Sequence, residues 1–121
     1  MAAIIFFEKP GCINNEKQKA ILIDAGNNLE CLNILEYPWS KEELGLFFAE
    51  KNPVSIMNHT APAIKSGEIL PENLNYEEAL ELMVKCPILI KRPLIRIENI
   101  FLQGFLDERL KPYLGSWDGK D

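Results

Sequence analysis

The chain has 121 residues, of which 47% are hydrophobic and 26% are charged, and its formal net charge is −5. This length predicts one domain around a single core, and the composition is ordinary for a soluble globular protein. The negative charge argues against non-specific nucleic-acid binding, which needs basic surfaces. No apolar run approaches the roughly 20 residues of a membrane span, and no basic segment precedes the first one, so we expect a cytoplasmic protein without a signal peptide.

Three cysteines, Cys12, Cys31 and Cys86, are an odd number without a close pair. This spacing excludes a full disulfide framework and a cysteine-based zinc site of the usual kind. A Cys-x-x-Cys dithiol is also absent, because the residue three after Cys12 is Asn15. Any redox chemistry must therefore use one thiol alone or recruit a partner thiol, and we expect no metal and no bound cofactor.

The first pattern in chain order is an apolar run over residues 2–7, which predicts a buried strand. Pro10 and Gly11 break it, and Asn14 and Asn15 then suggest the N-cap of a helix over residues 15–25. Cys12 is left between strand and helix, where unpaired N–H groups and the helix dipole favour a thiolate. Cys12 is therefore a candidate nucleophile. The alternative is an uncharged, half-buried thiol in a tight turn.

The pattern after the first helix predicts a parallel strand over residues 29–35, with Cys31 as a small core residue. Ser40 starts a capping box, which predicts a helix as far as Lys51. The segments that follow are predicted as a short helix over residues 54–59 and a loop over residues 61–68.

A second capping signal at Asn75 predicts a helix that ends before Cys86 and Pro87. Cys86 is expected to be another packed thiol, although its position at a helix end could expose it. Residues 94–97 and 100–103 predict an antiparallel hairpin, because Pro93 cannot lie within a central strand. A short helix over residues 107–113 and a frayed polar tail over residues 115–121 complete the chain.

Two motifs resemble those of the arsenate reductase (ArsC) family that couples to glutaredoxin, and of its Spx-like transcriptional relatives. Lys-Pro-Gly-Cys at residues 9–12 looks like the family's active-site turn, and Cys-Pro-Ile-Leu-Ile-Lys-Arg-Pro at residues 86–93 looks like its second signature. The register between them holds over residues 2–113. Pro-Gly-Cys-x-Asn-Asn, together with residues 61–67, resembles the branch called nitrogenase-associated proteins.

The resemblance implies an α/β fold of the thioredoxin-like (glutaredoxin-like) class, with a mixed four-stranded sheet and a helical insertion. Within a single domain over residues 1–121, the thioredoxin-like core would comprise residues 1–35 and 88–114. Residues 36–87 would form the insertion, and residues 115–121 the tail.

The resemblance also assigns roles to individual residues. It implies that Cys12 is the thiol nucleophile, that Arg92 contacts the substrate oxyanion and favours the thiolate, and that Pro93 lies against the cysteine after a cis peptide bond. Further candidates for oxyanion or substrate binding are Lys9, Asn14, Asn15 and His59. A lone histidine beside Thr60 is more often a hydrogen-bonded loop residue than a ligand or base.

Two further arginines of true arsenate reductases have no counterpart here, because residues 58–60 are Asn-His-Thr and residues 97–108 contain no arginine or lysine. An arsenate anion needs several preorganised cationic donors, so we expect arsenate reduction to be weak or absent.

The resemblance then implies a monothiol redox protein that acts with glutathione as co-substrate, with a glutaredoxin-type partner or with a nitrogenase-related protein. The alternative is a non-catalytic accessory or regulatory module linked to nitrogen fixation, which would dock through residues 53–74 and exposed Tyr37 or Trp39. Whether the chain is an enzyme stays open between these two, and we expect a monomer.

Overall fold

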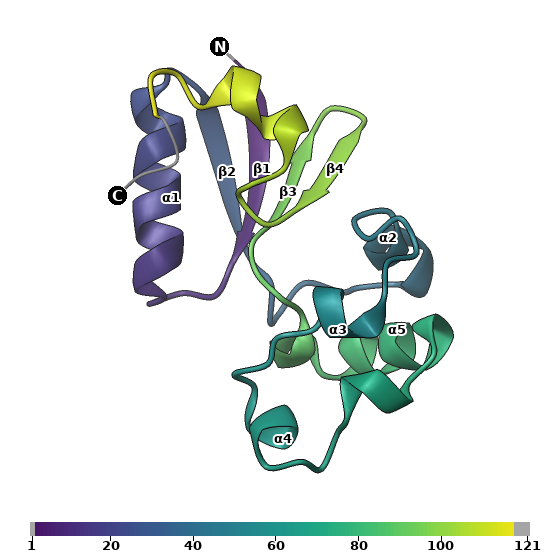
Figure 1. The fold of residues 1–121 in the computed structure, drawn as a ribbon. Coiled ribbons are helices and arrows are strands. Elements are labelled where there is room, and N and C mark those ends of the chain that lie inside the picture. Colours follow the sequence, from purple (N-terminus) through teal and green to yellow (C-terminus); the bar gives the residue numbers. More distant parts are fainter. Residues whose placement is uncertain (1, 118–121) are drawn as a thin grey trace. The chain divides into compact units, whose positions relative to one another are not determined.

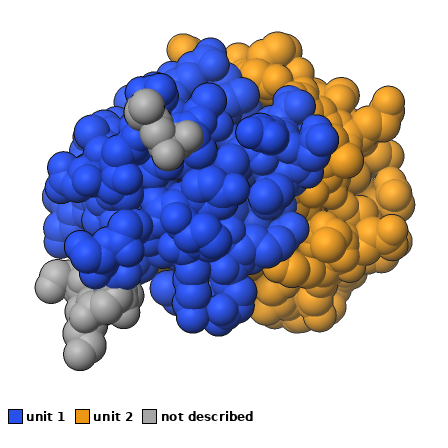
Figure 2. Space-filling view, turned by 90° about the horizontal axis from the view of Figure 1, so that it is seen from above, with its two compact units in different colours: residues 1–33, 92–121 blue, residues 34–91 orange. Residues whose placement is uncertain are grey.

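The computed structural model describes residues 2–117 and divides the chain into two compact units. Residues 1–33 and 92–121 belong to the first unit, and residues 34–91 form the second (Figure 2). The first unit carries the sheet, whereas the second is made of short helices and turns. Cys12, Arg92 and Pro93 all belong to the first unit, although they come from opposite ends of the chain.

A mixed four-stranded sheet in the order β2-β1-β3-β4 forms the centre of the first unit (Figure 1). β1 (Ala3–Glu8) runs parallel to β2 (Asn28–Asn33) and antiparallel to β3 (Leu94–Ile97). β4 (Ile100–Gln103) is the antiparallel hairpin partner of β3. The mixed sheet, the parallel β1–β2 pair and the hairpin predicted from the sequence are confirmed.

One face of this sheet is covered by α1 (Ile13–Asp24) and by the C-terminal segment. Ile4 and Phe6 lie on this face, because successive strand residues point to opposite sides. They pack with Leu22 of α1 and with apolar residues of the other strands and the C-terminal segment, which are Ile95, Ile97, Leu102, Phe105, Leu110 and Leu114. Losing a side chain as buried as Phe6 would cost about 3–5 kcal/mol of stability.

The helix α1 begins two residues earlier than the sequence predicted, at Ile13 rather than Asn15. Its N-cap is Cys12, so the expectation that Asn14 and Asn15 cap the helix is wrong. The chain has already turned at Pro10 and Gly11, where Gly11 adopts φ +84°, a conformation that glycine reaches without strain. The helix can therefore start directly after Cys12, and both asparagines fall in its first turn.

The second unit contains short helices joined by turns. Its elements are α2 (Lys41–Gly45), α3 (Pro53–Ile56), α4 (Pro62–Lys65), the 3₁₀ turn η1 (Pro71–Asn73), α5 (Tyr76–Lys85) and the 3₁₀ turn η2 (Pro87–Leu89). Ser40 caps α2 as predicted, but the helix ends at Gly45 instead of Lys51. The N–H groups of residues 46–48 donate to carbonyls three residues earlier, and Ala49 and Glu50 then take positive φ angles. Residues 61–68, expected to be a loop, contain α4. The capping box at Asn75 is confirmed.

Trp39 is a core residue of the second unit, not an exposed one. Only 7% of it is exposed, its indole N–H donates to the carbonyl of Ile34 at 3.0 Å, and its ring meets Phe47 edge-on. The expectation that Trp39 offers an exposed docking surface is therefore wrong. The hydroxyl of half-buried Tyr37 donates to the carboxylate of Glu43 at 2.6 Å.

The chain after β4 forms η3 (Glu108–Tyr113), a 3₁₀ helix in the place of the predicted short helix. The expected frayed tail is wrong for residues 115–117, because Trp117 packs edge-on against Phe105 with ring centroids 5.3 Å apart. The remainder of that predicted tail, residues 118–121, lies outside the described residues.

Candidate functional site

Cys12 lies in the turn that joins the carboxyl end of β1 to the first turn of α1, and its side chain is half-buried. Its backbone N–H donates to the carbonyl of Lys9 at 3.1 Å, and its carbonyl accepts the N–H of Glu16 at 3.1 Å. The thiol makes no capping hydrogen bond to the helix. The N–H groups of residues 13–15 have no intrahelical acceptor, because they belong to the first turn. An anion bound beside the thiol would find these donors and the positive end of the helix dipole.

Arg92 and Pro93 lie directly before β3, and the strand pairing brings them to the same end of the sheet as Cys12. Phe7 of β1 is paired with Leu94 of β3, so the residues that follow β1 and those that precede β3 lie at the same end of the sheet. Pro93 is buried, and the Arg92–Pro93 peptide bond is cis, as the family resemblance implied. The N–H of Gly104 donates to the carbonyl of Pro93 at 2.9 Å, which ties the end of β4 to this position.

The guanidinium of Arg92 has an unusual environment. Its Nε and Nη1 atoms are buried and have no hydrogen-bond partner, and no other side chain in the described part of the chain has a nitrogen or oxygen in this condition. An arginine keeps its charge at all accessible pH values, and a buried donor without an acceptor costs about 1–3 kcal/mol. Arg92 is therefore suited to an anionic group, whose oxygens or sulfur would accept from these N–H groups.

The other candidate residues fall into different environments. Lys9 is half-buried, and its backbone N–H donates to Oδ1 of Asn15 at 3.1 Å. Asn15 is buried, with 2% of its surface exposed, whereas Asn14 is exposed. His59 belongs to the second unit, where its Nε2 lies 2.6 Å from the carbonyl oxygen of Val54. The structure thus brings Lys9, Asn14 and Asn15 into the Cys12 turn, and it gives His59 the contact of a hydrogen-bonded loop residue.

An ion-pair cluster that the sequence analysis missed joins the end of β1 to α1. The ammonium of Lys19 lies 2.8 Å from the carboxylate of Glu8 and 3.0 Å from that of Glu16. Hydrogen bonds to these two carboxylates raise the pKa of Lys19, so its charge is secure at all physiological pH values. The spacing of three residues between Glu16 and Lys19 could have indicated half of this cluster. Glu8 joins it only through the packing of strand on helix.

Cys31 and Cys86 are both exposed, so the expectation of a packed thiol is wrong. For Cys86 the alternative, exposure at a helix end, is the one that the structure shows. For Cys31 the reason is the strand order, which places β2 at the edge of the sheet. Partial burial raises the pKa of Cys31, and the nearby charge of Glu8 raises it further. The sequence of β2 could have indicated an edge strand, because Cys31 has the polar neighbours Asn28, Glu30 and Asn33.

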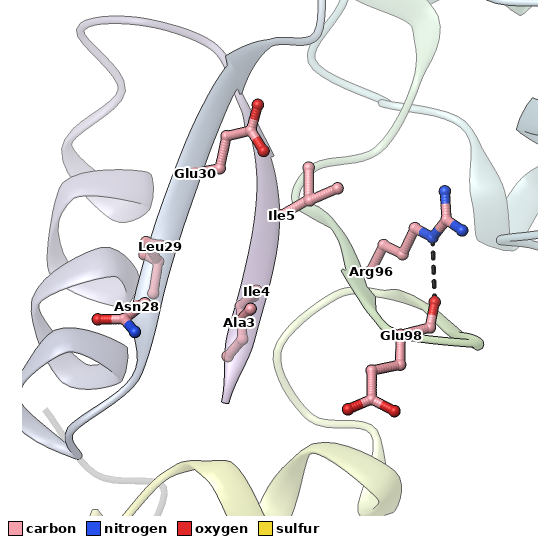
Figure 3. A pocket seen from close by; sticks show the side chains of 8 residues that line it. All are labelled: Ala3, Ile4, Ile5, Asn28, Leu29, Glu30, Arg96 and Glu98. Atoms are coloured by element: carbon pink, nitrogen blue, oxygen red, sulfur yellow. Dashed lines mark hydrogen bonds between the residues drawn. The ribbon is translucent and has the colours of Figure 1, made fainter. Parts of the chain in front are cut away.

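An open groove of about 560 Å³ lies on the sheet at the end opposite to Cys12 (Figure 3). In the groove, Ile5 of β1 is paired with Glu30 of β2 on one side and with Arg96 of β3 on the other. The side chain of Arg96 turns to the hairpin, where its Nε donates to the carbonyl of Glu98 at 3.0 Å and its guanidinium lies 4.9 Å from the centre of the Phe101 ring. Neither Cys12 nor Arg92 lines this groove.

The described residues 2–117 contain no cluster of histidine, cysteine and carboxylate side chains that could hold a metal ion. None of the helices in that part of the chain is both long enough and apolar enough to cross a membrane.

The mixed sheet, the cysteine turn after β1 and the proline before β3 define a thioredoxin-like fold. Among solved structures, the arsenate reductase from Vibrio cholerae matches with a TM-score of 0.76 at 20% identity, covering 93% of this chain and 98% of that one. The chain belongs to the ArsC family, whose model matches residues 7–112.

Two relatives show how the sequence compares within this family. The "uncharacterized 15.7 kDa protein in draG 3′ region" of Rhodospirillum rubrum is 43% identical over 115 residues, which are 95% of this chain and 80% of that protein. The global transcriptional regulator Spx of Streptococcus pyogenes serotype M1 is 26% identical over 113 residues, which are 92% of this chain and 84% of that protein.

The raised pKa of Cys31 leads to a prediction about thiol reactivity. A raised pKa means a smaller thiolate fraction at any given pH, so iodoacetamide should modify Cys31 more slowly at pH 7 than a thiol with the ordinary value of about 8.5. The Glu8→Gln variant removes a nearby negative charge and should speed the modification of Cys31. Peptide mass spectrometry over a range of pH values measures both rates. Modification of Cys31 at the rate of an unstructured cysteine peptide would contradict the prediction.

Proposed function

We propose that this chain is a monothiol redox protein that acts through Cys12 in the cytoplasm, with glutathione as co-substrate or a glutaredoxin-type protein as partner. The observation that carries this proposal is the guanidinium of half-buried Arg92, whose buried Nε and Nη1 have no acceptor within the described chain. The cysteine turn lies at the same end of the sheet. An anionic substrate bound at Cys12 would supply the acceptor that Arg92 lacks.

The proposed chemistry is thiol–disulfide exchange. The Cys12 thiolate attacks one sulfur of a disulfide such as oxidised glutathione, a new S–S bond forms, and the other half leaves as a thiolate that takes up a proton. A second thiol, from glutathione or a glutaredoxin, then attacks the glutathione sulfur of the mixed disulfide and releases the Cys12 thiolate. The second thiol must come from outside, because the residue three after Cys12 is Asn15 and not cysteine.

Arg92 has one role in this scheme: its buried N–H groups can hold a carboxylate or oxyanion of the bound substrate. Lys9 and Asn14 are further candidates for contacts to the substrate, since both lie in the turn around Cys12. His59 remains a candidate for substrate binding, and mutation of His59 would test its role in this scheme.

Oxidised glutathione should add one glutathionyl group to wild-type protein, at Cys12. A hydrogen bond to a charged group contributes about 1.5–3 kcal/mol, so Arg92→Ala should slow this modification about tenfold or more, and Arg92→Lys by less. Arg96→Ala is a matched control, because Arg96 lies in β3, the strand that follows Arg92, and its side chain turns to Glu98. Mass spectrometry of peptides measures the rates. A protein in which Cys31 or Cys86 reacts while Cys12 does not would contradict the proposal.

Arsenate reduction should be weak or absent. One arginine of the three expected in true arsenate reductases is retained, and oxyanion donors typically contribute about 10²–10³ in rate each. The assay couples arsenate to glutathione, glutaredoxin and the consumption of a nicotinamide cofactor. Turnover equal to that of a true family reductase would contradict this expectation, and would require another donor, such as Lys9 or His59, at the oxyanion.

A second candidate function is a regulatory or accessory module that binds a partner protein, linked to nitrogen fixation. The similarity to Spx, described as a global transcriptional regulator, favours it, as does the name of the Rhodospirillum rubrum relative, which places that protein in the draG 3′ region. Trp39 is buried, so the docking surface would have to use residues 53–74 without it, and Val54 and Leu70 are exposed there.

Cys12→Ser protein separates the two functions. Partners should be captured from nitrogen-fixing cells by wild-type protein and lost in the variant if thiol chemistry holds them, because the mixed disulfide needs the sulfur. Equal capture by both proteins would favour docking over thiol exchange.

A further inference from the structure

The buried side chain of Asn15 is the polar group on which the shape of the Cys12 turn depends. A buried amide is costly unless its donors and acceptor find partners. The oxygen Oδ1 accepts the backbone N–H of Lys9 at 3.1 Å, and the nitrogen Nδ2 donates to Oε1 of Gln18 at 3.1 Å. Both ends of the amide are therefore bonded within the protein, and only 2% of the residue is exposed. This environment is unlike that of a side chain that meets substrate.

We propose that Asn15 is a positioning residue, which holds the Pro10–Gly11–Cys12 turn in place and so fixes the thiol at the start of α1. This inference rests on the proposed function, because it concerns the same thiol, and it names a residue that acts without contacting the substrate.

Two hydrogen bonds on the backbone of Lys9 carry the argument. The N–H of Lys9 is bonded to the side chain of Asn15, and the carbonyl of Lys9 accepts the N–H of Cys12 at 3.1 Å. The first bond ties the beginning of the turn to α1, and the second closes the turn around Pro10 and Gly11. Gly11 is exposed, and apart from its chain neighbours no atom lies within 4 Å of the position that a Cβ would take. The hydrogen bond to Asn15 is therefore a local restraint on a loosely packed part of the turn.

The position of the thiol matters because its electrostatic support is short-ranged. The influence of a helix terminus fades within one turn, and a displacement of about 1 Å in a reacting group can cost about a hundredfold in rate. The backbone N–H of Lys9 can only donate, so it fixes Oδ1 of Asn15 on its side, and Nδ2 then donates to Oε1 of Gln18. An apolar side chain of similar volume would fill the same space and release the turn.

The ion pair between Glu8 and Lys19 is a separate tether. It joins the end of β1 to α1 but does not touch the backbone between Lys9 and Cys12. Loss of the Asn15 bond should therefore free the turn while β1 and α1 stay together. This separation makes the proposal testable on a folded protein.

The test compares Asn15→Leu with Asn28→Leu, an exposed asparagine of the same unit whose side chain is remote from the turn. Iodoacetamide labelling at pH 7 is followed by mass spectrometry at all three cysteines, so that Cys31 and Cys86 are internal references in each protein. We expect Asn15→Leu to slow Cys12 about tenfold with the reference cysteines unchanged, and Asn28→Leu to change nothing. A general loss of structure would instead accelerate the references.

Amide hydrogen exchange at Lys9 supplies a second measurement, which does not depend on the thiol. The Lys9 N–H should be protected in wild-type protein and exchange at least tenfold faster in Asn15→Leu, since its acceptor is gone. Should Asn15→Leu fail to fold, Gln18→Leu, which removes only the partner of Nδ2, should show the same two effects to a smaller degree.

The outcomes separate this inference from the proposed function. A reactive Cys12 in wild-type protein that reacts equally fast in the Asn15→Leu and Gln18→Leu variants would overturn the role of Asn15 and leave the thiol chemistry standing. Slow modification of Cys12 in wild-type protein, no faster than that of Cys86, would overturn the proposed function. In that case, faster hydrogen exchange of the Lys9 N–H in Asn15→Leu would still support the role of Asn15 in holding the turn. Unchanged exchange would overturn that role.

Discussion

The antiparallel pairing of β3 with β1 is the constraint on which the candidate site depends. Cys12 follows β1 and Arg92 precedes β3, and the register that pairs Phe7 with Leu94 brings both to one end of the sheet. The buried face of β1 makes this register specific, because a slip by one residue would turn Ile4 and Phe6 away from the core. The same apolar packing that stabilises the unit therefore assembles the residues that the family uses for chemistry.

Polar contacts refine what the packing assembles. The side chain of Asn15 bonds the backbone of Lys9, and the ion pair of Lys19 with Glu8 joins strand to helix beside the same turn. Both contacts lie inside the first unit, and both join a residue before Cys12 to a residue of α1 after it. Arg92 is different, because its buried N–H groups have no acceptor in the described chain. The polar side chains around the turn have hydrogen-bond partners within the chain, whereas Nε and Nη1 of Arg92 have none. This contrast favours Arg92 as the group that binds an anion from outside.

Sequence patterns predicted the elements well where local chemistry decides them. Proline and glycine after an apolar run marked the turn at Cys12, the capping box at Asn75 marked the start of α5, and the residues around Pro93 marked the beginning of the hairpin. Predictions failed where burial depends on distant neighbours. Cys31 was expected in the core but lies on an edge strand, and Trp39 was expected at the surface but bonds to Ile34 in the core of the second unit.

The sequence by itself determined the family, the order of the strands and helices along the chain, and the identities of Cys12, Arg92 and Pro93 as candidates. These follow from motifs and periodicities, which are local properties of the chain. Only the tertiary structure decided which strands lie at the edges of the sheet and which cysteines are exposed. It also showed that the side chain of Asn15 is hydrogen-bonded inside the turn instead of open to substrate. Burial and hydrogen-bond partners depend on residues far away in the chain, and a one-dimensional pattern carries no record of which of them come together.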